Sequence, residues 1–393
     1  ECAESTGKNI AVVGGGPGGL SAAYFLQLMG HQVTVYEMLP KLGGMLRYGI
    51  PNYRLPKERL DDDIQAILDT GVKVDCGKAI GKDYSIVDLK EKYDAVLITI
   101  GASTDKKLGL EGEDAKGVIS AVQFLRDVGH GTQESLEGKE VAVIGGGNVS
   151  MDAVRTSVRL GAKKVSIVYR RRVADMTALS DEISGAEAEG VEIKTLMAPS
   201  RIEKDEEGNV KGIWVTPQMI SNIKGGRASV KPTGEDDVFI PCQTLIVAIG
   251  QDIEYQHFEE AGVPVQRGKI NVEKFGGFEE MPGVFAGGDC ATGPSTVISA
   301  IAAGKVIAAN IDEYLGYHHE ITADVEIPEP KLEDKPACGR VNLTEREAGE
   351  RVKDFEGVEN CMTEKEACQE AGRCLRCDHF GYGIFKGGRD TKW

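Results

Sequence analysis

Two glycine-rich turns carry the clearest chemistry in this chain. The first, Gly14 to Gly19 (GGGPGG), has the spacing Gly-x-Gly-x-x-Gly directly after an apolar run. Its first glycine permits a tight turn, its second lets the backbone approach a pyrophosphate, and its third lets a helix pack closely on a strand. An acid about 20 residues further on accepts hydrogen bonds from ribose hydroxyls, and Glu37 stands at that place. An ordinary glycine turn is the alternative, but we expect a dinucleotide to contact Gly14, Gly16, Pro17, Gly18, Gly19 and Glu37.

The second turn, Gly145 to Ser150 (GGGNVS), repeats this pattern with one change. Tyr169 stands where the acid should be, and Arg170, Arg171 and Arg172 follow at once. Guanidinium groups in place of a carboxylate favour a 2′-phosphate over a free 2′-hydroxyl, although a solvated basic strand end would look the same. We therefore expect NADP(H), with NAD(H) as the alternative, to contact Gly145, Gly147, Asn148, Val149, Ser150, Arg170 and Arg171.

A third element indicates which turn holds which cofactor. Two dinucleotide sites in one chain are typical of hydride transfer between a bound flavin and an exchanging nicotinamide. The strand-like run from Val284 ends in Gly-Gly-Asp, and a helix is expected from Val297. An aspartate there can bind a ribityl hydroxyl, and a helix N-terminus can stabilise negative charge on the flavin ring. We expect these flavin contacts from Gly288, Asp289, Ser295, Thr296 and Val297.

Four of the nine cysteines lie in the last tenth of the chain. Their spacing is Cys-x6-Cys-x5-Cys-x2-Cys, from Cys361 through Cys368 and Cys374 to Cys377. Thiolates at this density can ligate a [4Fe–4S] cluster, and a zinc site or free thiols on a surface helix are the alternatives. Clustered cysteines are not a spread disulfide framework, so we expect a reducing, cytoplasmic compartment.

The cysteine pattern also argues against a disulfide reductase. Such an enzyme needs a redox pair facing the flavin, but no cysteine follows the first turn until Cys76, and the expected nicotinamide domain has no Cys-x-x-Cys. We interpret Cys290 as a small packing residue. Hydride transfer needs no protein base, so we expect no catalytic side chain.

The elements that must position these residues indicate an α/β fold with two Rossmann-like domains. Residues 8–37 and 139–170 each read as strand, glycine turn, helix and strand. Because the Gly-Gly-Asp element follows the second unit, the first domain must be interrupted. We expect an FAD-binding domain over 8–128 and 241–320, an inserted NAD(P)H-binding domain over 137–240, and a linker with a helical Cys-containing tail over 321–393. Residues 126–138 are the expected crossing, and 201–236 an expected β-meander.

Composition excludes two other classes of protein. The chain has 393 residues, with 46 Lys and Arg against 62 Asp and Glu, a net charge of −16 that argues against binding nucleic acid. No apolar run reaches the roughly 18 residues that a membrane-spanning helix needs. The sequence begins with Glu1 and shows no signal peptide, which leaves a fragment, a processed chain or a module of a longer protein as possibilities.

Together these residues resemble the glutamate synthase small-subunit family. The similar stretches span most of residues 8–310: GGMLRYGIP from Gly43, YRLPK from Tyr53, GGGNVSMD from Gly145, AIGQ from Ala248 and VFAGGDCATGPSTVI from Val284. The resemblance implies FAD in the first domain and NADP(H) in the inserted one. We add to the expected cofactor contacts Gly43, Gly44, Met45, Leu46, Arg47, Gly101 and Gly250.

The resemblance further implies an oxidoreductase module that passes electrons between NADP(H) and iron–sulfur clusters or ferredoxin by way of FAD. It implies iron–sulfur or ferredoxin-like partner subunits in a hetero-oligomer, with electron bifurcation as a sub-hypothesis. The chain departs from the family at one place, because the iron–sulfur segment that usually precedes the FAD strand is matched here by EAGRCLRC from Glu370. The alternatives are a structural relay subunit with a silent nicotinamide site and a stand-alone NAD(P)H flavin reductase.

Overall fold

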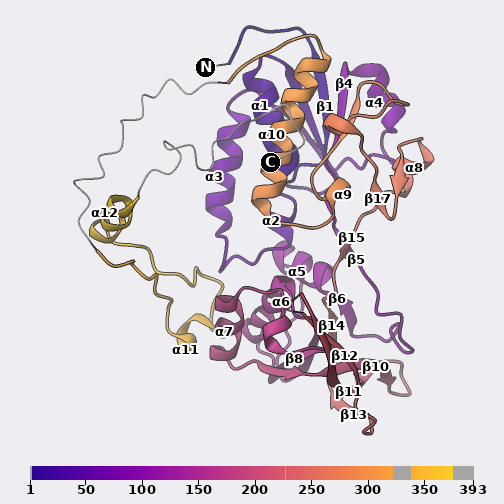
Figure 1. Cartoon of the computed structure of the whole chain (residues 1–393), viewed down its shortest axis with the longest axis vertical. Coiled ribbons are helices and arrows are strands. Elements are labelled where there is room, and N and C mark those ends of the chain that lie inside the picture. Colours follow the sequence, from indigo (N-terminus) through magenta and orange to yellow (C-terminus); the bar gives the residue numbers. More distant parts are fainter. Residues whose placement is uncertain (1, 226, 322–337, 375–393) are drawn as a thin grey trace.

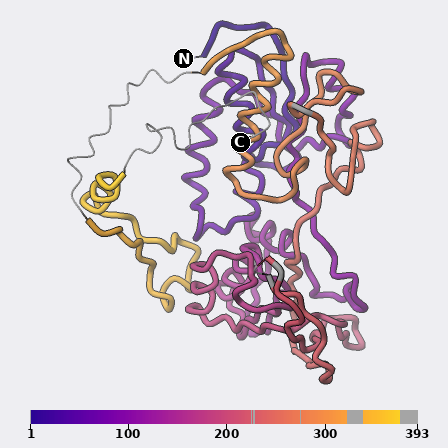
Figure 2. Tube along the Cα trace, in the orientation of Figure 1, coloured from indigo at the N-terminus to yellow at the C-terminus, as the bar shows by residue number. Residues whose placement is uncertain are grey.

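The computed structural model describes residues 2–225, 227–321 and 338–374. The described chain forms two α/β bodies, drawn one above the other in Figure 1. Figure 2 shows that the orange part of the chain returns to the indigo body after the red part has completed the other one. The first body is therefore built from two separate stretches of sequence, as the order of the motifs predicts.

The first body contains a five-stranded parallel sheet in the order β18-β4-β1-β2-β3. Strands β1 and β4 are almost wholly buried apolar runs, as expected of strands covered on both faces. The bounds are β1 Asn9–Val13, β2 Gln32–Glu37, β3 Lys73–Cys76, β4 Ala95–Ile98 and β18 Val284–Ala286.

Helices α1 (Pro17–Leu28) and α10 (Val297–Tyr314) pack against one another on this sheet. A Cβ atom on Gly304 would collide with the backbone oxygen of Gly18, so the two helices approach as closely as backbones allow. This packing sets the first turn of α10 beside the glycine turn that precedes α1. The other helices are α2 Met45–Tyr48, α3 Lys57–Leu68, α4 Ile86–Lys92, α8 Gln256–Glu260 and α9 Asp289–Thr292.

The second body repeats the design with a parallel sheet in the order β6-β14-β7-β8-β9. Its helices are α5 Ala121–His130, α6 Asn148–Arg159 and α7 Ser180–Ala188, and its strands β6 Val118–Ser120, β7 Glu140–Ile144, β8 Lys164–Tyr169, β9 Glu192–Thr195 and β14 Thr244–Val247. The predicted meander is present as an antiparallel sheet of β10 Met197–Lys204, β11 Val210–Lys224, β12 Arg227–Pro232 and β13 Val238–Pro241. An apolar core that includes Ile144, Ile213 and Leu245 joins the two sheets.

The chain passes between the bodies through a short antiparallel pair, β5 (Thr104–Asp105) and β15 (Gln251–Asp252). The sequence placed the crossing at 126–138, but residues 126–130 complete α5. The expected domain boundaries at 128 and 241 placed β6 and β14 in the first body. Both strands instead pair in the parallel sheet of the second body. Short strands give no sequence signal of which sheet they join, since pairing partners lie far apart along the chain.

The remaining elements include the strand pair β16 (Val265–Gln266) and β17 (Lys269–Ile270) and the helices α11 (Ala348–Arg351) and α12 (Glu364–Arg373). Thr363 caps α12, and the Glu366 carboxylate accepts the Thr363 backbone N–H in return. The helices of the described residues include none that is both long and apolar enough to cross a membrane. Much of the expected linker and Cys377 lie outside the described residues.

Candidate nucleotide-binding clefts

The first cleft lies where β1, β2 and β4 end and α1 begins. Parallel strands leave such a crevice at their carboxyl ends, where a helix N-terminus can point at a ligand. The predicted residues that line it are Gly14, Gly16, Pro17, Gly18, Glu37, Gly44, Met45, Gly101, Gly288 and Asp289.

The backbone of this turn fits a pyrophosphate. Gly14 has φ +107°, and a Cβ atom there would lie 2.5 Å from the Thr99 carbonyl oxygen, so no other residue fits. Beside Gly16 the nearest atom to an added Cβ would be Gly44 Cα at 3.8 Å, which leaves open space in front of the turn. The chain thus bends sharply at one glycine and exposes its backbone at the next.

Glu37 lies buried beneath the turn at the end of β2. Its Oε2 accepts the Gly15 N–H at 2.7 Å and its Oε1 accepts the Leu39 N–H at 2.8 Å. Burial raises the pKa of Glu37, while hydrogen bonds from the backbone of Leu39, Gly15 and Met38 oppose the shift. A carboxylate oxygen can accept more than one hydrogen bond, so Glu37 both fixes the turn and keeps acceptor capacity for a ribose.

Seven of the predicted flavin contacts do not line the cleft: Gly19, Gly43, Leu46, Arg47, Ser295, Thr296 and Val297. Gly19 lies behind the turn, where a Cβ atom would meet the Gly14 carbonyl oxygen. The Arg47 guanidinium is turned toward Asp61 and the Leu42 carbonyl oxygen. Gly43 and Leu46 lie on the same segment without reaching the surface of the cleft. Direct contact of these seven residues with the ligand remains a prediction.

Sequence reasoning missed Arg126, which enters the first cleft from α5. One of its terminal nitrogens donates to the Ser103 carbonyl oxygen at 2.9 Å. Its Nε is buried and, within the described residues, has no hydrogen-bond partner. An orphaned guanidinium nitrogen beside Glu37 fits an anionic or polar ligand. No local motif marks Arg126, because α5 belongs to the second body and reaches the first cleft only in the folded chain.

The Gly-Gly-Asp element closes the other side of the first cleft. Burial raises the pKa of Asp289, and a backbone hydrogen bond from Ser295 opposes this. Thr296 caps α10 by accepting the Ser299 N–H at 3.4 Å. The first-turn residues Val297 and Ile298 are exposed, so the positive end of α10 faces open space.

The second cleft is the larger and holds about 2100 Å³ of empty space, including its open mouth. It lies at the carboxyl ends of β7, β8 and β14. The predicted residues that line it are Gly145, Gly147, Asn148, Val149, Arg170, Arg171, Gly250 and Ser295. Ser150 does not line it, and its buried hydroxyl has no partner among the described residues.

The second glycine turn has the same geometry as the first. Gly145 has φ +149°, and a Cβ atom there would collide with the Ala248 carbonyl oxygen. Tyr169 occupies the place that Glu37 has in the first body, because its ring lies 2.7 Å from where a Gly146 Cβ would be. The Tyr169 hydroxyl donates to the Asp175 carbonyl oxygen at 2.8 Å. Among the described residues, no carboxylate therefore takes the place beneath this turn that Glu37 has beneath the first.

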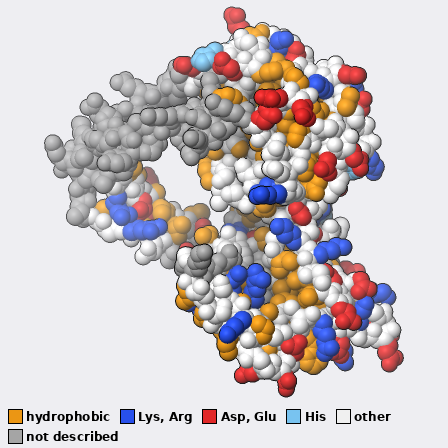
Figure 3. Space-filling model, turned by 45° about the vertical axis from the view of Figure 1, so that its right-hand side comes forward, with side chains coloured by type: hydrophobic (Ala, Val, Ile, Leu, Met, Phe, Trp, Pro, Cys, Tyr) orange, Lys and Arg blue, Asp and Glu red, His pale blue; other side chains and the backbone are white. Residues whose placement is uncertain are grey.

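The three arginines after Tyr169 have different surroundings. Arg170 is exposed, and Arg171 donates from Nε to the Ala228 carbonyl oxygen at 2.8 Å. Both line the cleft. Arg172 instead forms a two-point ion pair with Asp175 at 2.8 and 2.9 Å. Figure 3 shows Lys and Arg side chains gathered around the narrow part between the two bodies, in a protein that is acidic overall.

A loop of the first body contributes to the second cleft. Pro294 and Ser295, which belong to the loop between α9 and α10 of the first body, line the cleft of the second. The same loop follows Asp289, which lines the first cleft. A ligand lying across the second glycine turn can thus reach the side of the first cleft where α10 begins.

Neither cleft contains a histidine or a cysteine among the described residues that line it. Cys290 is fully buried, and burial raises its pKa to about 12, in agreement with its predicted packing role. His31 and His319 both bond to the buried Asp312, at 3.0 and 2.7 Å. This cluster closes the end of α10 on the first body, away from both clefts.

The structure describes three of the four cysteines of the predicted cluster. Cys361, Cys368 and Cys374 are exposed, and within the described residues they form no group whose sulfur atoms could share one metal ion. Cys377 lies outside the described residues. A further cysteine, Cys338, stands outside the predicted four-cysteine pattern and comes beside α12, because the Gly339 carbonyl oxygen accepts from the Gln369 side chain at 2.8 Å.

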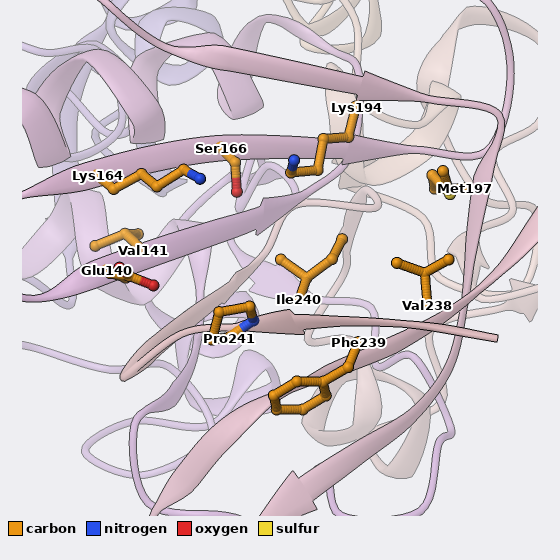
Figure 4. Close-up of a pocket in the computed structure, with 10 residues that line it drawn as sticks. All are labelled: Glu140, Val141, Lys164, Ser166, Lys194, Met197, Val238, Phe239, Ile240 and Pro241. Carbon is orange, nitrogen blue, oxygen red and sulfur yellow. The ribbon is translucent and has the colours of Figure 1, made fainter.

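A separate hollow lies between the second parallel sheet and β13 (Figure 4). Most of the residues that line it are apolar, and the side chains of Lys164 on β8 and Lys194 on β9 extend toward one another. Both lysines pair with Glu192, at 3.2 and 2.6 Å. No predicted site residue lines this hollow.

Comparison with known proteins assigns this arrangement to a family. A sequence model described as "Pyridine nucleotide-disulphide oxidoreductase" matches residues 8–304. Among curated proteins, the "NADP(+)-dependent formate dehydrogenase subunit beta" of Moorella thermoacetica is 39% identical over 98% of the chain. The "NADPH-Fe(3+) oxidoreductase subunit beta" of Geobacter sulfurreducens is 33% identical over 94%, and the "Glutamate synthase [NADPH] small chain" of Escherichia coli is 34% identical over 79%.

The chain spans only 56% and 61% of the lengths of the first two relatives and 70% of the third. Among solved structures, FprA from Mycobacterium tuberculosis matches with a TM-score of 0.68 at 20% identity, over 79% of this chain and 85% of that one. This likeness confirms the two-domain α/β fold.

Proposed function

The chain belongs to the pyridine nucleotide-disulphide oxidoreductase family, and from that premise we propose that it is an FAD-dependent module that passes electrons between NADP(H) and iron–sulfur centres of a larger complex. FAD occupies the first cleft and NADP(H) the second. The observation that carries the proposal is the position of Pro294 and Ser295, residues of the first body that line the second cleft.

The residues of the first cleft support a flavin dinucleotide. Gly16 offers exposed backbone to the pyrophosphate, Glu37 offers acceptor capacity to a ribose, and Arg126 offers an orphaned buried N–H. When bound, FAD supplies a ring that accepts two electrons as a hydride and can pass them on singly. The capped N-terminus of α10 stabilises negative charge that develops on that ring.

The second cleft favours NADP(H) over NAD(H). Tyr169 removes the carboxylate that would repel a 2′-phosphate, while Arg170 and Arg171 offer guanidinium groups at the strand end. The names of the relatives agree with this choice, since the formate dehydrogenase, Fe(3+) oxidoreductase and E. coli glutamate synthase chains are described with NADP(+) or NADPH.

Electron transfer, rather than disulfide reduction, is the second part of the proposal. The described lining of both clefts lacks the cysteine pair that disulfide chemistry requires. Curated relatives are named as subunits of formate dehydrogenase and NADPH-Fe(3+) oxidoreductase, which supports a hetero-oligomer. Iron–sulfur partners are what the resemblance to the glutamate synthase small-subunit family implies. The eight described cysteines are free thiols, which supports a reducing, cytoplasmic compartment.

We also propose that the C-terminal cysteines ligate a [4Fe–4S] cluster, with Cys338 as a further candidate ligand beside Cys361, Cys368, Cys374 and Cys377. The support is their density and the proximity of residue 339 to α12. The described cysteines are not gathered around one point, so the structure alone does not form the ligand set.

Anaerobic addition of NADPH and of NADH to the purified full chain tests the proposal. We expect bound FAD whose visible absorption bleaches rapidly with NADPH and slowly with NADH. A bound flavin that neither nucleotide bleaches would overturn the enzyme assignment in favour of a relay scaffold. Native purification followed by analysis of iron content and subunits tests whether the chain belongs to a larger complex. A lone chain that stays fully active without iron would overturn the proposed iron–sulfur complex.

A further inference from the structure

The C-terminal segment 345–358, which we name the strap, crosses the junction between the two bodies. Arg351 contacts the second body, where its Nε donates to the Glu189 carboxylate at 2.7 Å. Phe355 and Val358 contact the first body: the Phe355 carbonyl oxygen accepts from Asn52 at 3.0 Å, and the Val358 N–H donates to the Tyr53 carbonyl oxygen at 3.0 Å. Figure 1 shows α11, at the start of the strap, beside α7.

The first body reaches the same junction through Tyr53 and Arg54. The Tyr53 side chain is buried, and the Arg159 guanidinium of α6 lies 3.9 Å from its ring centre. Arg54 donates to Asp152 at 2.9 Å and pairs with Glu182 at 2.7 Å. The loop that follows α2 is therefore fastened to α6, the helix that begins at the second glycine turn.

Glu189, at the end of α7, is the centre of the junction. Arg155 and Arg159 pair with it at 2.7 and 2.6 Å, and Arg351 of the strap adds a third guanidinium. Burial alone would raise the pKa of Glu189, but the hydrogen bonds and charges of Arg159 and Arg155 outweigh it and lower the pKa to about 2. The carboxylate is thus charged at neutral pH, and Arg351 itself is only 4% exposed.

By itself, without the contacts of Tyr53, Arg54 and the strap, the covalent connection between the bodies would permit rotation. It consists of β5 and β15, paired over two residues each. Domains joined by such short connections move relative to one another unless further contacts restrain them. The strap supplies such a contact from a part of the chain that belongs to neither nucleotide-binding sequence motif.

We propose that the strap holds the second body at a fixed angle to the first, and that Arg351 is the positioning residue that anchors it. The angle decides how Ser295 of the first body faces the second glycine turn, and so the distance between the two ligands. This consequence rests on the proposed function, whereas the mechanical role does not. Thr363 follows the strap closely and caps α12, so the strap also ties the cysteine-bearing helix to this junction.

Hydrogen–deuterium exchange of the full chain tests the mechanical role without any cofactor. In Arg351→Ala we expect exchange to rise on the order of tenfold in residues 50–57 and 150–159 as well as in the strap. Arg346→Ala is the matched control, because its partner Asp354 lies within the strap and both side chains are partly exposed, 29% and 37%. Phe355→Ala, which loosens the strap on the first body only, gives the same pattern if Arg351→Ala does not fold.

If hydrogen–deuterium exchange rose only within the strap in Arg351→Ala and Phe355→Ala, the proposal would be overturned. The two bodies would then hold their angle without the strap. Rapid mixing with NADPH tests the consequence. We expect Arg351→Ala to lower the rate of flavin reduction at saturating NADPH on the order of tenfold, with unchanged nucleotide affinity and FAD content, and Arg351→Lys to recover part of the rate. Equal loss of affinity and rate would reject the positioning role, while a flavin that NADPH never reduces would reject the proposed function alone.

Discussion

Glu37 and Tyr169 occupy equivalent places beneath Gly15 and Gly146, the corresponding residues of two equivalent turns, one in each body. Glu37 accepts the Gly15 N–H at 2.7 Å, whereas the Tyr169 ring packs against Gly146 and its hydroxyl bonds to Asp175. One position thus presents a carboxylate to its ligand and the other an apolar ring followed by arginines. Under the proposed function, this difference would give the two turns different nucleotide specificities within one backbone geometry.

Replacing Arg170 and Arg171 with Ala removes the two guanidinium groups of the second cleft. A charge-assisted hydrogen bond contributes about 1.5–3 kcal/mol, so we expect the KM for NADPH to rise about tenfold to a hundredfold and that for NADH to change little. Steady-state kinetics with both nucleotides measures this. Lys164→Ala is the control, because it removes a cation from the other end of β8, paired with Glu192. Equal effects on both nucleotides would reject phosphate recognition.

Arg126→Ala removes the buried guanidinium of the first cleft. We expect the affinity of the apoprotein for FAD to fall about tenfold, because one hydrogen bond to a polar or anionic group of the ligand is lost. Fluorescence titration of the apoprotein with FAD measures this. Gln123→Ala is the control, since Gln123 is exposed on the same helix and its side chain bonds only to Asp127 among the described residues. An unchanged affinity would show that Arg126 does not contact the flavin.

Arg54→Ala leaves the buried carboxylate of Asp152 without its ion pair at 2.9 Å. Breaking a buried pair costs about 3–5 kcal/mol, and the partial exposure of Arg54 places the expected loss at the lower end, about 3 kcal/mol. Urea unfolding measures it. Arg59→Ala, which breaks an exposed pair in α3, is the control and should change stability by under about 0.5 kcal/mol. Similar losses of unfolding free energy in Arg54→Ala and Arg59→Ala would contradict a stabilising role of the Arg54–Asp152 pair.

The His31–Asp312 pair predicts that stability depends on pH. Burial lowers the pKa of His31 below its ordinary 6.5, although the hydrogen bond and charge of Asp312 oppose this. The unfolded chain then takes up a proton at His31 more readily than the folded chain. The stabilisation of the folded state by neutral, buried His31 is therefore present above pH 6.5. It is lost as the pH falls from 6.5 through the lowered pKa of His31. Thermal unfolding of the parent and of His31→Gln should converge over this interval, and parallel curves would contradict the prediction.

Cys374→Ser tests the proposed cluster. We expect iron and acid-labile sulfide in the anaerobically purified protein to fall toward the level of a chain without a cluster. Cys2→Ser is the control, because Cys2 is an exposed free thiol at the other end of the chain. Zinc instead of iron in the parent would reject the cluster in favour of a zinc site, and metal content unaffected by Cys374→Ser would reject Cys374 as a ligand.

Much of this molecule could be predicted because its signals are local. The two glycine turns and the order of strand, turn, helix and strand over residues 8–37 and 139–170 depend on residues within a few positions of one another. Backbone torsions and capping are decided by immediate neighbours, so a short stretch of sequence specifies them. For the same reason the exchange of Glu37 for Tyr169 can be read directly from the two aligned motifs.

Other features needed the folded chain. Which sheet β6 and β14 join, the entry of Arg126 into the first cleft, and the meeting of Ser295 with the second cleft all join residues that are distant in sequence. The pairing of Arg351 with Glu189, 162 positions apart, leaves no periodic or local pattern. Such contacts form only when packing brings separate elements together. The free energy that favours them therefore depends on the whole folded core. The sequence by itself therefore determined the chemistry of each nucleotide turn, and the tertiary structure decided how the two turns face one another.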